Sequence, residues 1–202
     1  MARKRNERQR ITMNVREAIE TRRTVRKFTQ RKIDRADLHE MIDCARLAAY
    51  GANLQPLKFK AVTDEGEVNA ISPYIKWAGY LENGAPAEGE RPTAYIAVLG
   101  DTEIKKNGSF ETDAGAAVTT MMLRATELEL ATCWLGAINR EQISKVLDIP
   151  ENLQLLYLLA VGESAQKSVT CDMKDGDVKY FVGEGDVLNV PKRSLEEIII
   201  GE

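Results

Sequence analysis

Apolar residues recur at helical spacing in several stretches of the chain, and this pattern defines the expected helices. Behind Asp34, whose carboxylate can cap a helix, the apolar positions lie three or four residues apart and would face a core. They are Leu38, Met41, Ile42, Ala45 and Ala49. Further helices are predicted over residues 14–22, over 66–81 with a break at Pro73, over 113–131 and over 140–147. A capping box of Ser194 and Glu197 predicts a short helix near the end of the chain.

Runs rich in apolar and β-branched residues define the expected strands. They cover residues 58–63, 93–99, 132–135 and 153–161, with a further candidate at 178–182 and an extended segment at 188–190. Two helices precede the first strand, and a regular alternation of strand and helix is missing. The pattern therefore favours an α+β protein over a doubly wound parallel sheet.

The helix predicted over 113–131 is apolar on nearly all of its faces. A helix of that kind is buried on most sides. Small residues at Ala114, Gly115, Ala116 and Ala117 would let another backbone approach closely. We expect this helix either at the centre of the domain or at a subunit interface.

Length and composition set the broad class. The chain has 202 residues, of which 44% are hydrophobic and 29% charged, as in a soluble globular domain, and its net charge of −3 indicates no general affinity for nucleic acid or anionic membrane. Cys44, Cys133 and Cys171 show no CxxC spacing and are typical of reduced thiols, so we expect a cytoplasmic protein. With His39 as its single histidine, the chain lacks the residues for most metal sites and for a Ser-His-Asp triad.

The first residues form a basic arm, and residues 14–202 are expected to form one domain. Five Lys or Arg side chains fall within residues 1–10, and the apolar run that follows is too short for a signal peptide. We expect residues 1–13 to be a solvated or disordered arm. A tether to nucleic acid or to an anionic surface is the alternative.

Two groups of cations are candidates for binding an anion. Arg22, Arg23 and Arg26 lie where the first helix ends. There they can favour the helix dipole, but three guanidinium groups so close together repel one another unless an anion lies among them. Lys192 and Arg193 come directly before the last helix, where the dipole disfavours cations and favours an anion. A solvated basic turn is the alternative for this second pair.

Two uncharged segments could contact a flat ligand. Asn53 and Gln55 are amides two residues apart in a turn that Pro56 ends, and each can donate and accept hydrogen bonds, as the edge of a flavin ring requires. An ordinary polar turn is the alternative. Gly136 follows the strand at 132–135 and could let the backbone come close to a ring.

The order of these motifs resembles the FMN-dependent nitroreductase family over nearly the whole chain. The motifs are Arg-Arg-Thr-x-Arg-x-Phe, Ala-Asn-Leu-Gln-Pro, Asp-x-Gly-Ala-Ala at the start of the long helix, Cys-Trp-Leu-Gly, and Pro-Lys-Arg-Ser-Leu-Glu-Glu. The resemblance implies a nitroreductase-like α+β fold, with a mostly antiparallel mixed sheet flanked by helices. It also implies an interlocked homodimer that binds FMN at two sites between the subunits.

The resemblance also assigns roles to residues. Arg22 would hold the FMN phosphate together with Lys192 and Arg193, while Arg23 and Thr24 would lie near the phosphate and the ribityl chain. Arg26 would approach the N1/C2=O edge of the ring. The main chain of Leu135 and Gly136 would pass the ring, and the partner subunit would contribute Ala52, Asn53 and Gln55.

The activity implied is transfer of hydride from NAD(P)H, through FMN, to a nitroaromatic, a quinone or an activated alkene by a ping-pong mechanism. No protein nucleophile, catalytic acid or base, or metal is expected, because the flavin carries the redox chemistry. The alternatives are a flavin-binding sensor or storage protein without turnover, and an interaction protein whose basic arm binds nucleic acid. Tyr50 and Leu57 depart from the Ser and Trp that the family often has beside the amide turn. An aromatic wall from Tyr74, Trp77 and Tyr80 could line the substrate pocket.

Overall fold

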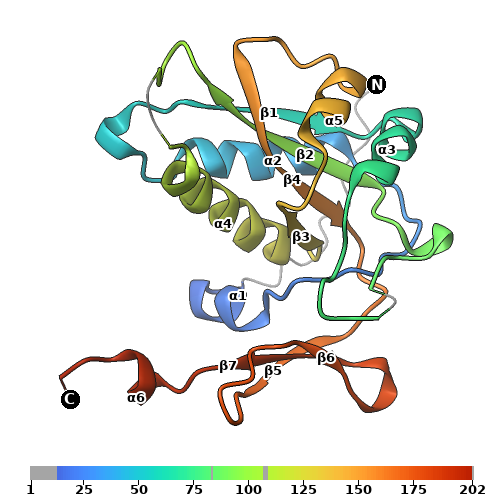
Figure 1. Cartoon of the computed structure of the whole chain (residues 1–202), viewed down its shortest axis with the longest axis vertical. Helices are drawn as coiled ribbons and strands as arrows, with labels where there is room; N and C mark the ends of the chain where they lie inside the picture. The colour runs from blue at the N-terminus through green and yellow to red at the C-terminus, as the bar shows by residue number, and fades with distance from the viewer. Residues whose placement is uncertain (1–12, 83, 107–108, 202) are drawn as a thin grey trace.

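A fully buried strand, β2 (Ala94–Asp101), runs through the middle of the main sheet. The computed structural model describes residues 13–82, 84–106 and 109–201 (Figure 1). Strands β1 (Leu57–Val62), β4 (Leu153–Gly162) and β3 (Ala131–Leu135) complete a four-stranded sheet in the order β1-β2-β4-β3, and every neighbouring pair is antiparallel. A sheet whose central strand is apolar on both faces needs a layer of helices on each side.

Helices supply both layers. Helices α2 (Arg35–Arg46) and α4 (Glu111–Glu127) pack on one face, and α3 (Glu65–Ile71) and α5 (Arg140–Val146) pack on the other (Figure 1). The pairing register shifts between Val98 and Leu99, so Leu155 and Leu158 of β4 both face the α3–α5 side. The long helix α4 thus lies against the sheet, as its apolar surface predicts.

Helix ends follow local chemistry. Helix α1 (Val15–Thr21) begins with a capping box between Asn14 and Glu17. The chain leaves α4 at Leu128, and Glu129 then adopts a positive φ of 59°, so the helix stops short of the predicted residue 131. The helix predicted over 66–81 is wrong beyond Ile71, because the chain turns through a 3₁₀ segment (Ser72–Tyr74) and Ile75 then bridges to Ile138.

Residues 168–192 contain a second, smaller sheet. Strands β5 (Ser168–Asp172), β7 (Leu188–Lys192) and β6 (Phe181–Val182) pair in the order β5-β7-β6, with β5 parallel to β7. In Figure 1 this C-terminal sheet lies below α1, and α6 (Leu195–Ile198) extends away from the rest of the chain. The strand β5 was not predicted: Ser168–Asp172 alternates between polar and apolar residues, but the run is only five residues long and mostly half-exposed.

The C-terminal arm, residues 193–201, has exposed apolar side chains in the single chain. Leu195 is 63% exposed, Ile198 is 61% exposed and Ile200 is 99% exposed. Exposed apolar residues grouped on an extended arm are typical of a surface that another chain covers. The interlocked homodimer stays a prediction that this feature supports.

The fold class is α+β, as predicted. The basic arm of residues 1–13 lies, except for Met13, outside the described residues. Within the part of the chain that the structure describes, no helix combines the length and apolar character that crossing a bilayer requires.

Gly162 is a sensitive point of this fold, because Phe28 packs directly on it. A β-carbon at Gly162 would lie 2.7 Å from Cδ1 of Phe28, whose side chain is buried. We expect Gly162→Ala to lower the free energy of unfolding by about 1–3 kcal/mol, the usual cost of overpacking, in urea denaturation. The matched control is Gly89→Ala, where a β-carbon meets no atom within 4 Å. Equal stabilities of the two variants would contradict the tight packing at Phe28.

Candidate functional site

The segment from Arg22 to Phe28 runs along the free edge of the main sheet. Thr24 forms a parallel bridge with Thr132 of β3, and the Val25 N–H donates to the Thr132 carbonyl over 3.0 Å. This pairing sets Arg22 near the start of β3 and Arg26 near its end. Four residues of extended chain span about 13 Å, so the two cations occupy opposite ends of an elongated strip.

A cavity of about 220 Å³ opens beside Arg22. Its walls come from the end of α1, the turn that follows α4, the start of β3 and the loop before β5. The lining residues are Thr21, Arg22, Arg23, Val25, Thr126, Glu129, Leu130, Ala131, Thr132, Ser164, Gln166 and Ser168. Two cations and one carboxylate face this space, so its net charge is positive.

Arg22 and Arg23 differ in what they bind. Arg23 donates to the carbonyls of Ile19 (3.3 Å) and Glu20 (2.7 Å), and so caps the C-terminal end of α1. Burial lowers the pKa of Arg22, and the neighbouring charge of Arg23 lowers that pKa further. No carboxylate of the described residues is among the groups that act on the pKa of Arg22. The ion pairs of the described residues do not include Arg22 either, so it is a half-buried cation without a counterion there, which favours an anion in the cavity.

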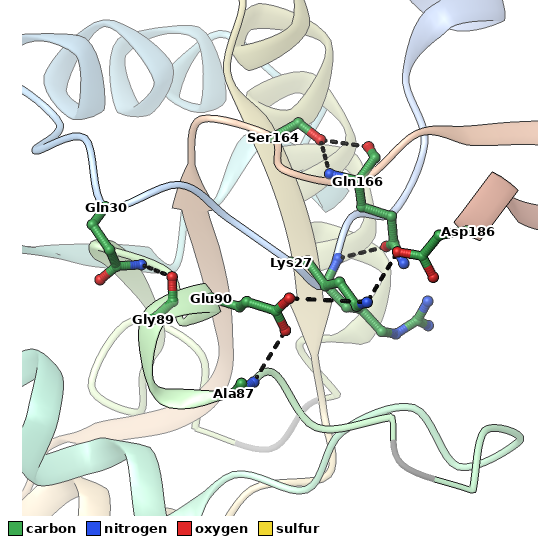
Figure 2. A network of polar contacts seen from close by, with 9 residues as sticks. Lys27, Gln30, Ala87, Gly89, Glu90, Ser164, Gln166 and Asp186 are labelled. Carbon is green, nitrogen blue, oxygen red and sulfur yellow. Dashed lines mark hydrogen bonds and ion pairs between the residues drawn. The ribbon is translucent and has the colours of Figure 1, made fainter.

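The loop between β4 and β5 is held to the Arg22–Phe28 segment. The Ser164 hydroxyl donates to the Gln166 carbonyl over 2.6 Å, and the Arg26 N–H donates to Oε1 of Gln166 over 3.3 Å (Figure 2). The hydroxyl oxygen of Ser168, two residues further on, is buried and has no hydrogen-bond partner among the described residues. Ser168 is one of the residues that line the same cavity as Arg22.

The C-terminal sheet also docks on Arg26 and Lys27. The Arg26 guanidinium lies 4.2 Å from the centre of the Tyr180 ring, and that ring lies 5.1 Å from Tyr80. Lys27 pairs with Asp186 at 3.1 Å and with Glu90 at 3.9 Å, and Figure 2 shows its ammonium group between the two carboxylates. The hydrogen bond to Asp186 is the main cause that raises the pKa of Lys27. Arg26 therefore has one face stacked on an aromatic ring.

The amide turn lies at the other edge of the sheet. Asn53 and Gln55 precede β1, whereas Arg22 and Arg26 lie outside β3, which is itself three strand spacings or about 14 Å from β1. Ala52, Asn53 and Gln55 all have positive φ, at 49°, 54° and 51°. Non-glycine residues rarely adopt that region, and such strain is typical of functional sites. One chain does not bring the two halves of the predicted site together, in agreement with a turn donated by a partner subunit.

A buried carboxylate holds the strained turn in place. Asp113 is 2% exposed; its Oδ1 accepts the Gly51 N–H at 2.9 Å and its Oδ2 pairs with Lys105 at 2.9 Å. Burial alone would raise the pKa of Asp113, but the Gly51 N–H and the Lys105 ammonium together hold that pKa below its usual range. Sequence reasoning used Asp113 only as the start of a motif; its charge at the head of the uncharged run 114–123 was the signal for this role.

Tyr50 and Leu57, the two departures beside the turn, both have structural roles. The Tyr50 hydroxyl donates to the Ala45 carbonyl at 2.9 Å, and burial followed by the charge of Asp113 raises its pKa. Leu57 is buried in the core beneath α2 and α4. The turn is thus built without the usual Ser and Trp.

The remaining predicted residues fall in two places. Leu135 is buried while Gly136 is exposed at the end of β3, so the Gly136 main chain is free on one side. Lys192 lies opposite Asp172 in the β5–β7 ladder, four residues or about 13 Å along the sheet from the Ser168–Leu188 position. Arg193 forms an ion pair with Glu197. The structure does not bring Lys192 and Arg193 into the Arg22 cavity.

The predicted aromatic wall is only partly available. Tyr74 and Trp77 are partly buried and pack against the core, so only part of each ring could face a substrate. Tyr80 is exposed and reaches Tyr180, a residue that sequence reasoning did not single out. Within the described residues, no group of three or more His, Cys, Asp or Glu side chains could hold a metal ion.

The chain belongs to the nitroreductase family, whose model matches residues 19–163. A protein of Archaeoglobus fulgidus, named as a candidate NADH dehydrogenase/NAD(P)H nitroreductase, is 28% identical over 150 residues, which cover 71% of this chain and 82% of that protein. The FMN reductase (NADPH) of Bacillus subtilis is 24% identical over 170 residues, which cover 77% of this chain and 68% of that protein. The predicted family is therefore confirmed.

Solved structures agree on the fold. A nitroreductase family protein of Clostridium difficile has a TM-score of 0.63 at 25% identity and covers 76% of this chain and 86% of its own. A nitroreductase-type protein of Desulfovibrio desulfuricans, solved in complex with FMN, has a TM-score of 0.66 at 24% identity. The match covers 93% of this chain and 96% of that protein. The predicted nitroreductase-like fold is confirmed.

Asp113 offers a test of the strained turn. Because its folded pKa is lowered, its contribution to stability is present above the ordinary carboxyl pKa of about 4 and is lost as pH falls through the folded value. We expect Asp113→Asn to lower the free energy of unfolding by about 1–3 kcal/mol at pH 7, measured in urea. The difference from the wild type should shrink at pH 3.

Asp43→Asn is the matched control, since Asp43 forms an exposed ion pair with Arg46 on the surface of α2. Such a pair contributes little, so that variant should unfold like the wild type. A difference at Asp113 that does not change between pH 7 and pH 3 would contradict the role of its charge.

Proposed function

We propose that this protein is an FMN-dependent oxidoreductase that takes hydride from NAD(P)H and passes it to a small electron-poor acceptor. The observation that carries the proposal is the pair of cations along β3: Arg22 in a positive cavity, and Arg26 about 13 Å further on beside an exposed glycine. An elongated ligand with an anion at one end and a polar ring edge at the other matches this strip.

The residues around Arg22, at one end of the strip, fit the phosphate of FMN. Arg22 lacks a counterion in the described chain, and the Ser168 hydroxyl lacks a partner. A phosphate would satisfy both, because it accepts hydrogen bonds and carries the opposite charge. Thr24 lies between this end and Arg26, where the ribityl chain would run, and Arg23 would add its charge while capping α1.

The residues at the ring end also fit. Tyr180 stacks on one face of the Arg26 guanidinium, which leaves its N–H groups free to donate in the plane of the group. The Arg26 cation would then stabilise negative charge on the N1/C2=O edge of the ring. The exposed main chain at Gly136 would lie against the ring without a side chain between them.

A homodimer would complete each site. Ala52, Asn53 and Gln55 lie at the β1 edge, too far from Arg26 to share its ligand within one chain. The Gln55 amide donates to Oδ1 of Asn53 at 3.2 Å, which sets both amides on one side of the strained turn. In the partner's site these amides would donate to and accept from the edge of the ring.

When bound, FMN would supply the redox chemistry, accepting hydride from NAD(P)H and delivering it to the acceptor. The chain's own task is to bind, orient and stabilise charge, and no acid or base is needed from it. Nitroaromatics, quinones and activated alkenes are the acceptors we propose. Because nicotinamide and acceptor would use one place in turn, the kinetics would be ping-pong.

Cofactor binding and reduction test this proposal together. We expect the purified protein to bind FMN with about one site per chain, measured by quenching of flavin fluorescence. Anaerobic NADH or NADPH should then bleach the bound flavin, and steady-state lines for a quinone should be parallel at several nicotinamide concentrations. Failure to take up FMN would refute the proposal, whereas binding without bleaching would favour a flavin-binding protein without turnover.

Arg26 tests the ring end. We expect Arg26→Gln to make the bound flavin harder to reduce and to slow reduction by NAD(P)H at least about tenfold, because a preorganised positive charge is lost. The midpoint potential of the flavin and anaerobic stopped-flow traces would measure this. Arg46→Gln, which removes an exposed surface cation, is the control. An unchanged midpoint potential in Arg26→Gln would place Arg26 away from the ring.

A further inference from the structure

Ser168 is a buried hydroxyl that the fold leaves without a partner. Its Oγ is buried and has no hydrogen bond among the described residues, and Ser168 is one of the residues that line the cavity beside Arg22. The family model ends at residue 163, so Ser168 belongs to the part of the chain that the family pattern does not cover. Buried polar groups are almost always paired, and an exception calls for an explanation.

The backbone around Ser168 is fixed on both sides. Ser168 pairs with Leu188 in the β5–β7 ladder, and the Leu188 N–H donates to the Lys167 carbonyl over 2.9 Å. On the other side, Gln166 is held by Ser164 and by the Arg26 N–H. Ser168 is therefore held beside the cavity, and rotation about its Cα–Cβ bond can turn the hydroxyl toward a ligand there.

The charge around the cavity favours an anion as the missing partner. Arg22 has no counterion in the described chain, and Arg23 adds a second positive charge, against the single carboxylate of Glu129. An anion that accepts several hydrogen bonds would satisfy the Arg22 guanidinium and the Ser168 hydroxyl at once. A phosphate monoester has this chemistry.

We propose that Ser168 is a phosphate ligand, donating its hydroxyl hydrogen to a phosphate oxygen that Arg22 also binds. The inference rests on the proposed function, in which the phosphate is that of FMN. It differs from the prediction that gave this role to Lys192 and Arg193, which lie about 13 Å from Ser168 along the β5–β7 ladder; Arg193 also pairs with Glu197. The bound phosphate would then join the main domain, through Arg22, to the C-terminal sheet, through Ser168.

The variant Ser168→Ala tests the proposal against two flavins. We expect its Kd for FMN to rise about tenfold, while its Kd for riboflavin, which lacks the phosphate, stays that of the wild type; both are measured by fluorescence titration. Thr170→Ala, an exposed position two residues along the same strand, is the matched control and should bind both flavins normally. An unchanged FMN affinity in Ser168→Ala, or equal weakening for both flavins, would overturn the proposal.

The stability of the apoprotein separates a ligand-binding role from a structural one. Since the Ser168 hydroxyl is unpaired without ligand, Ser168→Ala should melt at or above the temperature of the wild-type apoprotein. A lower melting temperature would show that the hydroxyl has a structural partner and would count against the proposal. Arg193→Ala gives the direct comparison: a larger loss of FMN affinity there than in Ser168→Ala would restore the C-terminal pair as the phosphate ligands.

Inorganic phosphate keeps this inference distinct from the proposed function. At constant ionic strength, phosphate should raise the melting temperature of the wild-type apoprotein more than chloride does, and Ser168→Ala and Arg22→Ala should both lose that rise. If the wild type binds neither flavin but retains this phosphate effect, the proposed function fails and the phosphate site stands. If FMN binds to the wild type and to Ser168→Ala alike, the proposed function stands and the Ser168 site fails.

Discussion

The pairing of the Arg22–Phe28 segment with the edge of β3 is the constraint on which the candidate site depends. It consists of one bridge, Thr24 to Thr132, continued by the hydrogen bond from the Val25 N–H. Because an extended backbone has a fixed rise per residue, this bridge sets the spacing of Arg22 and Arg26 along the sheet. It also covers part of an edge that would otherwise present unpaired backbone groups. The position of both cations is therefore a property of the main sheet, not of a flexible loop.

The second half of the site depends on a different constraint, at the opposite edge of the same sheet. Asp113 is buried where α4 begins, and it binds the Gly51 N–H and Lys105 together. These bonds offset the strain of three positive φ angles over Ala52 to Gln55. A strained, exposed amide turn has no evident role within one chain. A shared site explains why the turn is kept rigid while it lies far from Arg26.

Much of this arrangement could be predicted from the sequence, and the parts that could not share a physical cause. The long helix, the four main strands and the two Arg positions follow from hydrophobic period and helix-end chemistry, which are local. The bond from Gly51 to Asp113, the Gln166 bridge to Arg26 and the Tyr180 stack join residues 62, 140 and 154 positions apart by sequence number, and no local pattern records them. Strand β5 was missed because it is short and mostly half-exposed, although its residues alternate between polar and apolar. Lys192 and Arg193 were placed by motif, and their distance from Arg22 depends on the register of β5 with β7.

The C-terminal sheet gains a role from these long-range contacts. The segments next to its strands touch the site at three points: Gln166 at the Arg26 backbone, Tyr180 at the Arg26 guanidinium, and Asp186 at Lys27. The three contacts differ in kind, since they are a hydrogen bond, a cation–π contact and an ion pair, so no single condition of salt or pH removes all of them. Arg26 is thereby oriented from two directions before any ligand arrives, and orientation of this kind lowers the cost of binding. A sheet outside the family's matched residues thus completes the ring end of a site whose frame is the common fold.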